Sequence, residues 1–198
     1  MTKHHADAPK QVSDRETAEI LKIAESHLAT AGDFVELGCY RGDTSVLLER
    51  LLEKNASKKR LWIYDSFEGL PKRAPEDGSS AGTEFRKGEL LVTKREVVLK
   101  FKKAGLRLPI IKKNFFENLD ENSDLPDHIA FAFLDGDLYT SIKTSLKLVA
   151  PKLDKNGIII VHDYSNPQLQ GVARAVDEWL KTHPNFHLRR FETLAIIE

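Results

Sequence analysis

Acidic and histidine side chains follow the apolar runs of this sequence and are of the types that bind cations or move protons. Asp135 and Asp137 come directly after the apolar run Ile129–Leu134, and His162 and Asp163 follow the next apolar run. Residues two apart in a strand share a face, so the first two carboxylates can converge on one site. Oxygen ligands suit Mg2+, Ca2+ or Mn2+, whereas a histidine favours a transition metal. These residues therefore predict a cation site with carboxylates beside it.

Two of these residues also have a structural interpretation. Asp137 can cap a helix that begins at Leu138, and His162 can be a hydrogen-bonded histidine at the end of a strand. Asp135 ends a run of six apolar residues, a position at which a carboxylate is rarely structural. A chemical role is therefore expected first for Asp135.

A second group of residues lies in the turn after the apolar run Phe34–Leu37. Gly38 and Gly42 flank Tyr40 there, and glycines in a strand-to-helix turn let the backbone approach a ligand closely. Tyr40 stands where the dinucleotide fingerprint needs glycine, so the turn does not match that fingerprint. Glu36 indicates a cationic or hydroxyl-bearing ligand. The alternative is a plain turn in which the glycines only ease packing.

Asp65 follows a third apolar run, Leu61–Tyr64. A carboxylate at this strand end is placed to accept both hydroxyls of an adenosine ribose. The alternative is a solvated acidic residue in a loop. The separation of Asp65 from Gly38 along the chain favours the ribose role.

Short apolar runs alternate with helical patterns along the chain. The runs expected to form strands are 34–37, 61–64, 109–111, 129–134, 158–161 and 194–197, and the helical patterns lie at 13–28, 43–52, 94–104, 138–149 and 172–180. This alternation predicts an α/β fold with a doubly wound, mostly parallel sheet. Phe186–Arg190 and Thr193–Ile197 are separated by a short turn, which predicts an antiparallel hairpin at the end of the sheet.

Three local features set expectations for helix starts and loops. Ser13 and Glu16 have the spacing of a capping box, and Asp43 can cap the helix that follows the glycine turn. The segment Pro71–Gly88 is rich in glycine, proline, serine and charge. Long segments of this kind in compact domains are usually functional or disordered, so a mobile loop or lid is expected there.

The composition limits the class of protein. A chain of 198 residues that is 41% hydrophobic and 30% charged predicts a single domain, assigned to residues 13–198 after a flexible stretch 1–12. Thirty basic and thirty acidic residues argue against a nucleic-acid or membrane-surface binder. The single cysteine, Cys39, excludes an internal disulfide. No apolar run approaches the ~20 residues of a membrane helix, and no secretory signal is present. A cytoplasmic protein is expected.

Together these motifs resemble class I S-adenosylmethionine-dependent methyltransferases, and more specifically the macrocin O-methyltransferase (TylF-type) family. The matching segments are 34–38 with 41–42, 65–71, 134–139, 157–164 and 171–176. Of these, D-S-F-E-G-L-P at 65–71 and D-G-D-L-Y at 135–139 are the specific ones. The resemblance covers nearly the whole chain from about Val12 onward.

The resemblance implies a Rossmann-like, seven-stranded sheet and methyl transfer from S-adenosylmethionine to a hydroxyl of a small molecule, such as a sugar or a natural product. The cofactor-binding residues that it implies are Glu36, Gly38, Tyr40, Gly42 and Asp135 toward the methionine end, Asp65 at the ribose, and Ser66, Asn114 and Phe115 near the adenine. It also implies a divalent cation at Asp135, His162 and Asp163. Asp137 is then the candidate general base, so that Asp135 and Asp137 form the catalytic pair.

One position departs from the family pattern. After the fifth strand the family has Asp-Asp-Tyr, whereas this chain has His-Asp-Tyr at 162–164. An imidazole in place of a carboxylate weakens the site for Mg2+, which prefers oxygen ligands. Mn2+ or another divalent transition ion becomes an alternative, and so does a site without metal.

Other functions remain open at this level. A metal-independent methyltransferase acting on another nucleophile is one alternative, and a catalytically silent module that binds the cofactor is another. A nucleotide-sugar or nicotinamide enzyme is a third, against which Tyr40 argues. The expected partner is a small-molecule acceptor rather than a nucleic acid or a membrane, and assembly into a homo-oligomer is left open.

Overall fold

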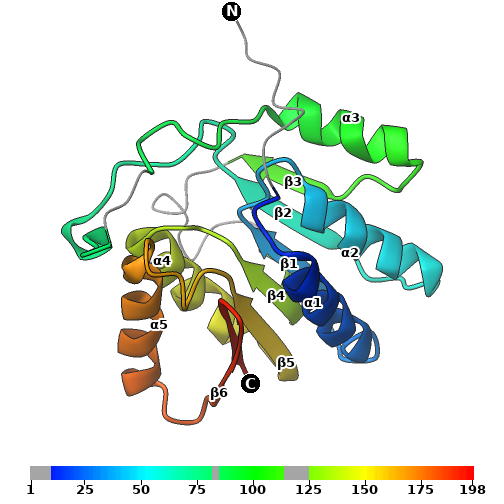
Figure 1. Cartoon of the computed structure of the whole chain (residues 1–198). Coiled ribbons are helices and arrows are strands. Elements are labelled where there is room, and N and C mark those ends of the chain that lie inside the picture. The colour runs from blue at the N-terminus through cyan, green and yellow to red at the C-terminus, as the bar shows by residue number, and fades with distance from the viewer. Residues whose placement is uncertain (1–9, 82–84, 114–124) are drawn as a thin grey trace, which may run out of the picture.

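Seven strands form one mixed sheet at the centre of the molecule (Figure 1). The computed structural model describes residues 10–81, 85–113 and 125–198. Within them the strands are β1 (Asp33–Leu37), β2 (Leu61–Asp65), β3 (Ile110–Lys113), β4 (Ile129–Leu134), β5 (Leu153–Val161), β6 (Leu188–Phe191) and β7 (Leu194–Ile197). Their order is β3-β2-β1-β4-β5-β7-β6, and β7 is antiparallel to both of its neighbours. The other pairs are parallel. The expected doubly wound sheet with an antiparallel C-terminal hairpin is confirmed.

Helices cover both faces of this sheet (Figure 1). The α-helices of the described residues are α1 (Asp14–Ser26), α2 (Asp43–Lys54), α3 (Lys94–Ala104), α4 (Tyr139–Val149) and α5 (Gln170–Thr182), with two short 3-10 helices, η2 (Pro75–Asp77) and η4 (Ala150–Lys152). The first three α-helices pack on one face, and α4 and α5 pack on the other. With both faces covered, the strand ends are where the sheet can meet a ligand.

Alternate residues of the central strands face the two helical layers. On β4, Phe131 and Phe133 pack with the core of α1, α2 and α3, whereas Ala132 and Leu134 pack with the core of α4 and α5. All four side chains are fully buried. This burial on both faces explains why β4 is an unbroken apolar run in the sequence, as is typical of parallel strands.

One expected helix cap is present and another is not. The Ser13 hydroxyl accepts the N–H of Glu16, and the Glu16 carboxylate accepts the N–H of Ser13, which confirms the capping box at α1. Asp43 does not cap α2, because the cap residue is Gly42 in the left-handed region at φ 70°. Asp43 is instead the first helical residue, where its charge still favours the positive end of the helix dipole.

The start of α4 shows that the capping interpretation of Asp137 is wrong. The cap residue is Leu138, and the N–H of Tyr139 donates to Oδ1 of Asp77 at 2.7 Å. Asp77 is buried and lies in η2, far earlier in the chain. The carboxylate of Asp137 is therefore not needed to begin this helix.

The segment expected to form a mobile loop or lid is held by hydrogen bonds within its described part. Arg73 donates to the carbonyl of Asp77, and the N–H of Ala74 donates to Oδ2 of Asp77 at 2.8 Å. The Ser79 hydroxyl donates to the carbonyl of Pro167 at 2.6 Å. The first two bonds hold residues 73–77 together, and the third joins Ser79 to the segment before α5. A lid role stays a prediction.

Some strand bounds differ from the expected ones. β3 is Ile110–Lys113 rather than 109–111, and β5 begins at Leu153 rather than at 158. The early part of β5 carries exposed polar residues, so hydrophobicity alone does not reveal it. The first hairpin strand is Leu188–Phe191 rather than 186–190. In the described ranges, none of the helices has the length and apolar character needed to cross a membrane.

Candidate functional site

The candidate site lies where β1, β4 and β5 end side by side. The parallel hydrogen-bond ladder continues one residue beyond the strands: the N–H of Asp135 donates to the carbonyl of Leu37 at 2.8 Å, and the N–H of His162 donates to that of Leu134 at 3.0 Å. The sheet therefore fixes the backbones of Asp135 and His162 in adjacent rows. The two residues are thereby brought side by side at this edge of the sheet.

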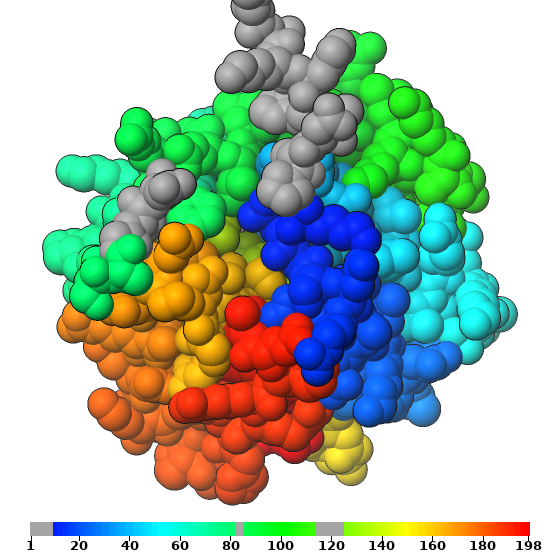
Figure 2. All heavy atoms as spheres, in the orientation of Figure 1, coloured from blue at the N-terminus to red at the C-terminus, as the bar shows by residue number. Residues whose placement is uncertain are grey.

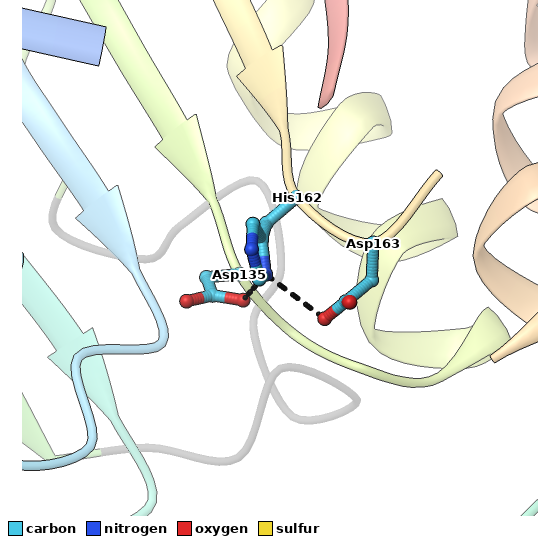
Figure 3. A group of neighbouring side chains, drawn as sticks. All are labelled: Asp135, His162 and Asp163. Carbon is cyan, nitrogen blue, oxygen red and sulfur yellow. Dashed lines mark hydrogen bonds and ion pairs between the residues drawn. The ribbon is translucent and has the colours of Figure 1, made fainter. Parts of the chain in front are cut away.

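Asp135, His162 and Asp163 form a cluster of potential ligands (Figure 3). Nδ1 of His162 lies 3.0 Å from Oδ1 of Asp135 and 2.9 Å from Oδ2 of Asp163. One ligand atom from each residue lies within 4.8 Å of the others. Figure 3 shows the imidazole between the two carboxylates, so that its Nδ1 faces both. This donor set of two oxygens and one nitrogen is suited to a divalent cation that accepts a nitrogen ligand.

The other side of the imidazole faces α1. Oε2 of Glu16 lies 3.7 Å from Nε2 of His162, and both side chains are only 4% exposed. Burial by itself lowers the pKa of His162, but the nearby carboxylates of Asp135, Asp163 and Glu16 raise it well above its usual value. From the sequence alone, Glu16 is assigned only a capping role. Glu16 reaches the site because it is a buried residue of α1, and the Nε2 edge of His162 faces that helix.

Asp137 lies beside this cluster with an unusual backbone. Its φ is 58°, in the left-handed region. On either side of it, the N–H of Leu138 donates a hydrogen bond to the carbonyl of Gly136. Burial, together with the carboxylates of Asp135 and Asp163, raises the pKa of Asp137 well above its usual value. The carboxylate therefore holds a proton more strongly than an exposed aspartate does, as a proton acceptor in catalysis needs.

A cavity opens beside these acids. Its lining includes seven of the residues expected at the site: Gly38, Tyr40, Asp65, Ser66, Asp135, Asp137 and Asp163. Leu70, Leu90 and Ser141 of α4 also line it. The cavity therefore joins the carboxyl ends of β1, β2, β4 and β5.

Glu36 lies in a second cavity that shares Tyr40 and Asp135 with the first. The side chain is 1% exposed, and its Oε2 has no hydrogen-bond partner among the described residues. Burial raises the pKa of Glu36 to about 8, helped by the carboxylates of Asp135 and Asp65. A buried carboxylate oxygen without a partner is costly, which indicates that a ligand with a positive charge or a donor completes the site.

The glycine turn is built around Asp65. Oδ2 of Asp65 accepts the N–H groups of Cys39 at 2.9 Å and Tyr40 at 3.2 Å. Gly38 has a φ of 91°, and a Cβ there would overlap the carbonyl of Asp135. Cys39 is buried, as expected of a small packing residue. Asp65 thus organises the turn, and a carboxylate has further acceptor capacity for ribose hydroxyls.

The remaining expected cofactor residues have different positions. Ser66 lines the main cavity, and its hydroxyl donates to the carbonyl of Gly69 at 2.9 Å. Gly42 lines neither of the cavities described above and serves as the cap residue of α2. Asn114 and Phe115 lie outside the described residues.

Left-handed backbone conformations gather at this edge of the sheet. Tyr40, Phe67, Asp137 and Asp163 have φ values of 44°, 53°, 58° and 61°, and they follow β1, β2, β4 and β5 respectively. Such conformations cost about 1 kcal/mol or more for residues other than glycine. Their concentration at four neighbouring strand ends is typical of a functional site.

Comparisons with curated proteins identify relatives of known name. The 8-demethyl-8-(2,3-dimethoxy-alpha-L-rhamnosyl)-tetracenomycin-C 4'-O-methyltransferase of Streptomyces olivaceus is 30% identical over 141 residues, covering 68% of this chain and 53% of that protein. The demethyldecarbamoylnovobiocin O-methyltransferase of Streptomyces niveus is 31% identical over 140 residues, covering 67% of this chain and 53% of that protein. The chain thus spans about half the length of these relatives.

Solved structures share the fold. The O-methyltransferase NovP superposes with a TM-score of 0.82 at 25% identity, covering 96% of this chain and 82% of NovP. An O-methyltransferase from Bacillus cereus in complex with SAH has a TM-score of 0.66 at 13% identity, covering 96% of this chain and 81% of that one. The family model described as macrocin O-methyltransferase (TylF) matches residues 15–187. The chain therefore belongs to the macrocin O-methyltransferase (TylF) family.

Proposed function

We propose that this protein transfers a methyl group from S-adenosylmethionine to a hydroxyl of a small molecule, with a divalent cation bound at Asp135, His162 and Asp163. The observation that carries the proposal is that Asp135, Asp137 and Asp163 line one cavity, with Nδ1 of the buried His162 within 3.0 Å of two of these carboxylates. Each follows a central strand of a methyltransferase fold. Asp135 and Asp137 are the proposed catalytic pair.

The residues that line the two cavities are suited to the charged and polar groups of S-adenosylmethionine. The unpartnered carboxylate oxygen of Glu36 suits the ammonium group at the methionine end. The absence of a side chain at Gly38 leaves the turn close to Asp135. Asp65 lies at the end of β2 in the main cavity, where ribose hydroxyls are bound in related sheets. The roles that the family resemblance implies are kept for the remaining residues: the methionine end for Gly42, and the adenine for Ser66, Asn114 and Phe115.

The donor set also fits a metal ion. Two carboxylates and one imidazole offer ligand atoms within 4.8 Å of one another, and the nitrogen favours Mn2+ or another transition ion over Mg2+. A bound cation supplies Lewis-acid chemistry that lowers the pKa of a coordinated hydroxyl. Because His162 must be neutral to act as a ligand, metal binding should release a proton and weaken as the pH falls.

The chain's own residues carry the rest of the proposed reaction. As the new bond forms between the acceptor oxygen and the methyl carbon, the bond between that carbon and the sulfonium sulfur breaks. Asp137 accepts the proton of the hydroxyl. Asp135 and Asp163 orient the acceptor from the floor of the cavity. Methyl transfer of this kind needs close alignment more than any other contribution, so a rigid site at strand ends is suited to it.

The relatives point to the class of acceptor. Their names describe methylation of a sugar hydroxyl on tetracenomycin and of a novobiocin precursor. We therefore propose a sugar or natural product as the acceptor, in a cytoplasmic protein with no nucleic-acid or membrane partner. Assembly into a homo-oligomer is compatible with this proposal.

A metal-free site is the second candidate, favoured by one observation. Nδ1 of His162 lies within hydrogen-bonding distance of two carboxylates, so a protonated imidazole neutralises part of their charge by itself. In that case the acceptor hydroxyl would lose its proton without a Lewis acid. A third candidate, a silent module that binds the cofactor, retains only the Glu36 and Asp65 contacts.

Calorimetric titration separates these candidates. S-adenosylmethionine is titrated into the protein alone, and then with Mg2+, with Mn2+ and with a chelator, and each ion is also titrated directly. The same titrations on His162→Asp test the departure from the family pattern. Because the variant restores an oxygen ligand, it should bind Mg2+ more tightly than the wild type does.

Each result has a defined reading. Binding of S-adenosylmethionine together with Mn2+ supports the proposed function. Cofactor binding with no heat from either ion, followed by methyl transfer in the presence of chelator, supports the metal-free site. No cofactor binding under any of these conditions would overturn all three candidates.

A further inference from the structure

Glu16 has more partners than a helix cap requires. A capping box needs one carboxylate oxygen to accept the N–H of the cap residue, and here Oε2 accepts that of Ser13 at 3.1 Å. The second oxygen, Oε1, accepts the N–H of Thr193 at 3.0 Å and its hydroxyl at 2.5 Å. Thr193 lies in the turn between β6 and β7. The carboxylate is therefore fixed from two directions, by α1 and by the C-terminal hairpin.

These two elements are in contact on the surface as well. Figure 2 shows the start of the described chain in blue against the C-terminal hairpin in red. Ser13 and Arg15 bind the carboxylate of Glu192 in the same turn, at 3.0 and 2.9 Å. Glu16 is the buried member of this junction, at 3% exposure. Its orientation is thus set by a network outside the cavity.

The fixed carboxylate faces the far side of the His162 ring. Oε2 of Glu16 lies 3.7 Å from Nε2, while Nδ1 faces Asp135 and Asp163. A histidine that acts through one ring nitrogen is oriented by the partner of the other nitrogen, which fixes both the tautomer and the plane of the ring. Glu16 is therefore placed to hold the Nε2 edge of the ring while Nδ1 faces the two aspartates.

We propose that Glu16 is a positioning residue for His162, holding the ring with Nε2 toward α1 and Nδ1 toward Asp135 and Asp163. The proposal rests on the proposed function, because it assigns Nδ1 to the site. The helix cap alone does not explain a glutamate here, since glutamine serves in the same position of a capping box. The charge of Glu16 is therefore available for a second task.

The chain provides a matched control for this test. Helix α3 begins with a second capping box, in which the Glu96 carboxylate accepts the N–H and the hydroxyl of Thr93, both at 2.7 Å. Glu96 is exposed, and Figure 1 shows α3 near β3 and away from β5, the strand that His162 follows. Glu96→Gln makes the same chemical change as Glu16→Gln at a cap of the same type, but without the histidine.

The experiment compares the wild type, Glu16→Gln, Glu96→Gln and Thr193→Val. The first readout is the ring 15N spectrum of His162 without added metal, with His162→Gln to assign its signals. The second readout is the affinity for Mn2+ by calorimetry. Glu16→Gln should shift the His162 ring signals and weaken Mn2+ binding about 10–100-fold, whereas Glu96→Gln should change neither. Thr193→Val removes one bond that fixes Glu16, so it should move the same signals by a smaller amount.

The outcomes distinguish this proposal from the proposed function. If the His162 ring signals of Glu16→Gln and Thr193→Val match those of the wild type, the positioning role of Glu16 is overturned, whether or not Mn2+ binds. If the wild type gives no Mn2+ binding but Glu16→Gln and Thr193→Val still shift the ring signals, the positioning role stands and the metal is removed from the proposed function. Thr193→Val supplies the test if Glu16→Gln does not fold.

Discussion

The chemistry at the residue scale depends on how many carboxylates share one small volume. Asp135 and Asp163 lie within 3.0 Å of the His162 ring, and Asp137 lines the same cavity. Carboxylates this close repel one another unless a cation or a proton is shared among them. Either a metal ion or the imidazolium of His162 can supply the positive charge that balances these carboxylates.

Asp135 is the residue whose loss should separate the two binding functions. In Asp135→Ala one ligand atom of the cluster is removed, so the affinity for Mn2+ should fall by on the order of 100-fold or more. Most of the affinity for S-adenosylmethionine should remain, because Glu36 and Asp65 are unchanged. Calorimetry with each ligand measures both quantities. Asp127→Ala, at an exposed carboxylate that pairs with Lys152, is the control. Unchanged Mn2+ affinity in Asp135→Ala would contradict the assignment.

Glu36 should make the stability of the ligand-free protein depend on pH. Its pKa is about 8 in the folded protein against 4.5 for an ordinary glutamate. Between these values the folded state keeps a proton that the unfolded chain has lost, so stability falls as the pH rises through this window. Glu36→Gln has no proton to lose. Its melting temperature should match that of the wild type below pH 4.5 and exceed it at pH 8.5.

The control for this pH profile is an exposed glutamate. Glu68 pairs with Lys113 at the surface, and both side chains are more than half exposed. Glu68→Gln should follow the wild type at every pH. A constant difference in melting temperature between Glu36→Gln and the wild type across the pH range would show that Glu36 does not titrate as stated.

At the scale of elements, one buried aspartate ties three segments together. Asp77 of η2 accepts the first N–H of α4, and its Oδ1 lies against Gly171 in α5. A Cβ at Gly171 would overlap this oxygen. Helix α4 contributes Ser141 to the cavity lining. The start of this helix therefore depends on the absence of a side chain at Gly171 in α5.

This contact reverses the usual effect of a helical glycine substitution. Alanine in place of glycine inside a helix normally stabilises by about 1 kcal/mol, but Gly171→Ala should destabilise because the new methyl group displaces Asp77. Asp77→Ala alone should cost about 1 kcal/mol through loss of the cap. In the double variant, the added cost of Gly171→Ala should be smaller than in the wild type. Urea denaturation measures all four proteins, and strictly additive losses would contradict the contact.

The sequence predicted the strands and turns that have a local pattern, but it did not predict side-chain contacts between segments that are far apart in the chain. The apolar run of β4 and the glycine turn gave the positions of Asp135 and Gly38 directly, because a parallel strand and its turn are local features. Asp77 and Glu16 could not be assigned in this way. Each acts on an element far away in the chain, and only the packed structure brings the two together.

At the scale of the whole molecule, ligand binding should stabilise the folded protein, because its buried and closely spaced carboxylates are concentrated at one edge of the sheet. S-adenosylmethionine at 100 times its dissociation constant adds about 2.7 kcal/mol to the free energy of unfolding. For a chain of this length each kcal/mol raises the melting temperature by about 2–4 °C. A rise of roughly 5–11 °C is expected in a thermal melt. No rise at millimolar cofactor would contradict cofactor binding.

The strand order also determines when this edge comes into existence during folding. β4 pairs with β1 on one side and β5 on the other, although α2, β2, α3 and β3 lie between β1 and β4 in the sequence. Pairing of strands that are distant in sequence is slow, because long loops must close first. Asp135 and His162 lie side by side only when β4 and β5 are paired, and the Glu16 carboxylate has its Thr193 partners only when the C-terminal hairpin is in place. A nascent chain that ends before β5 lacks His162 and Asp163, so it should not form the cluster of potential ligands.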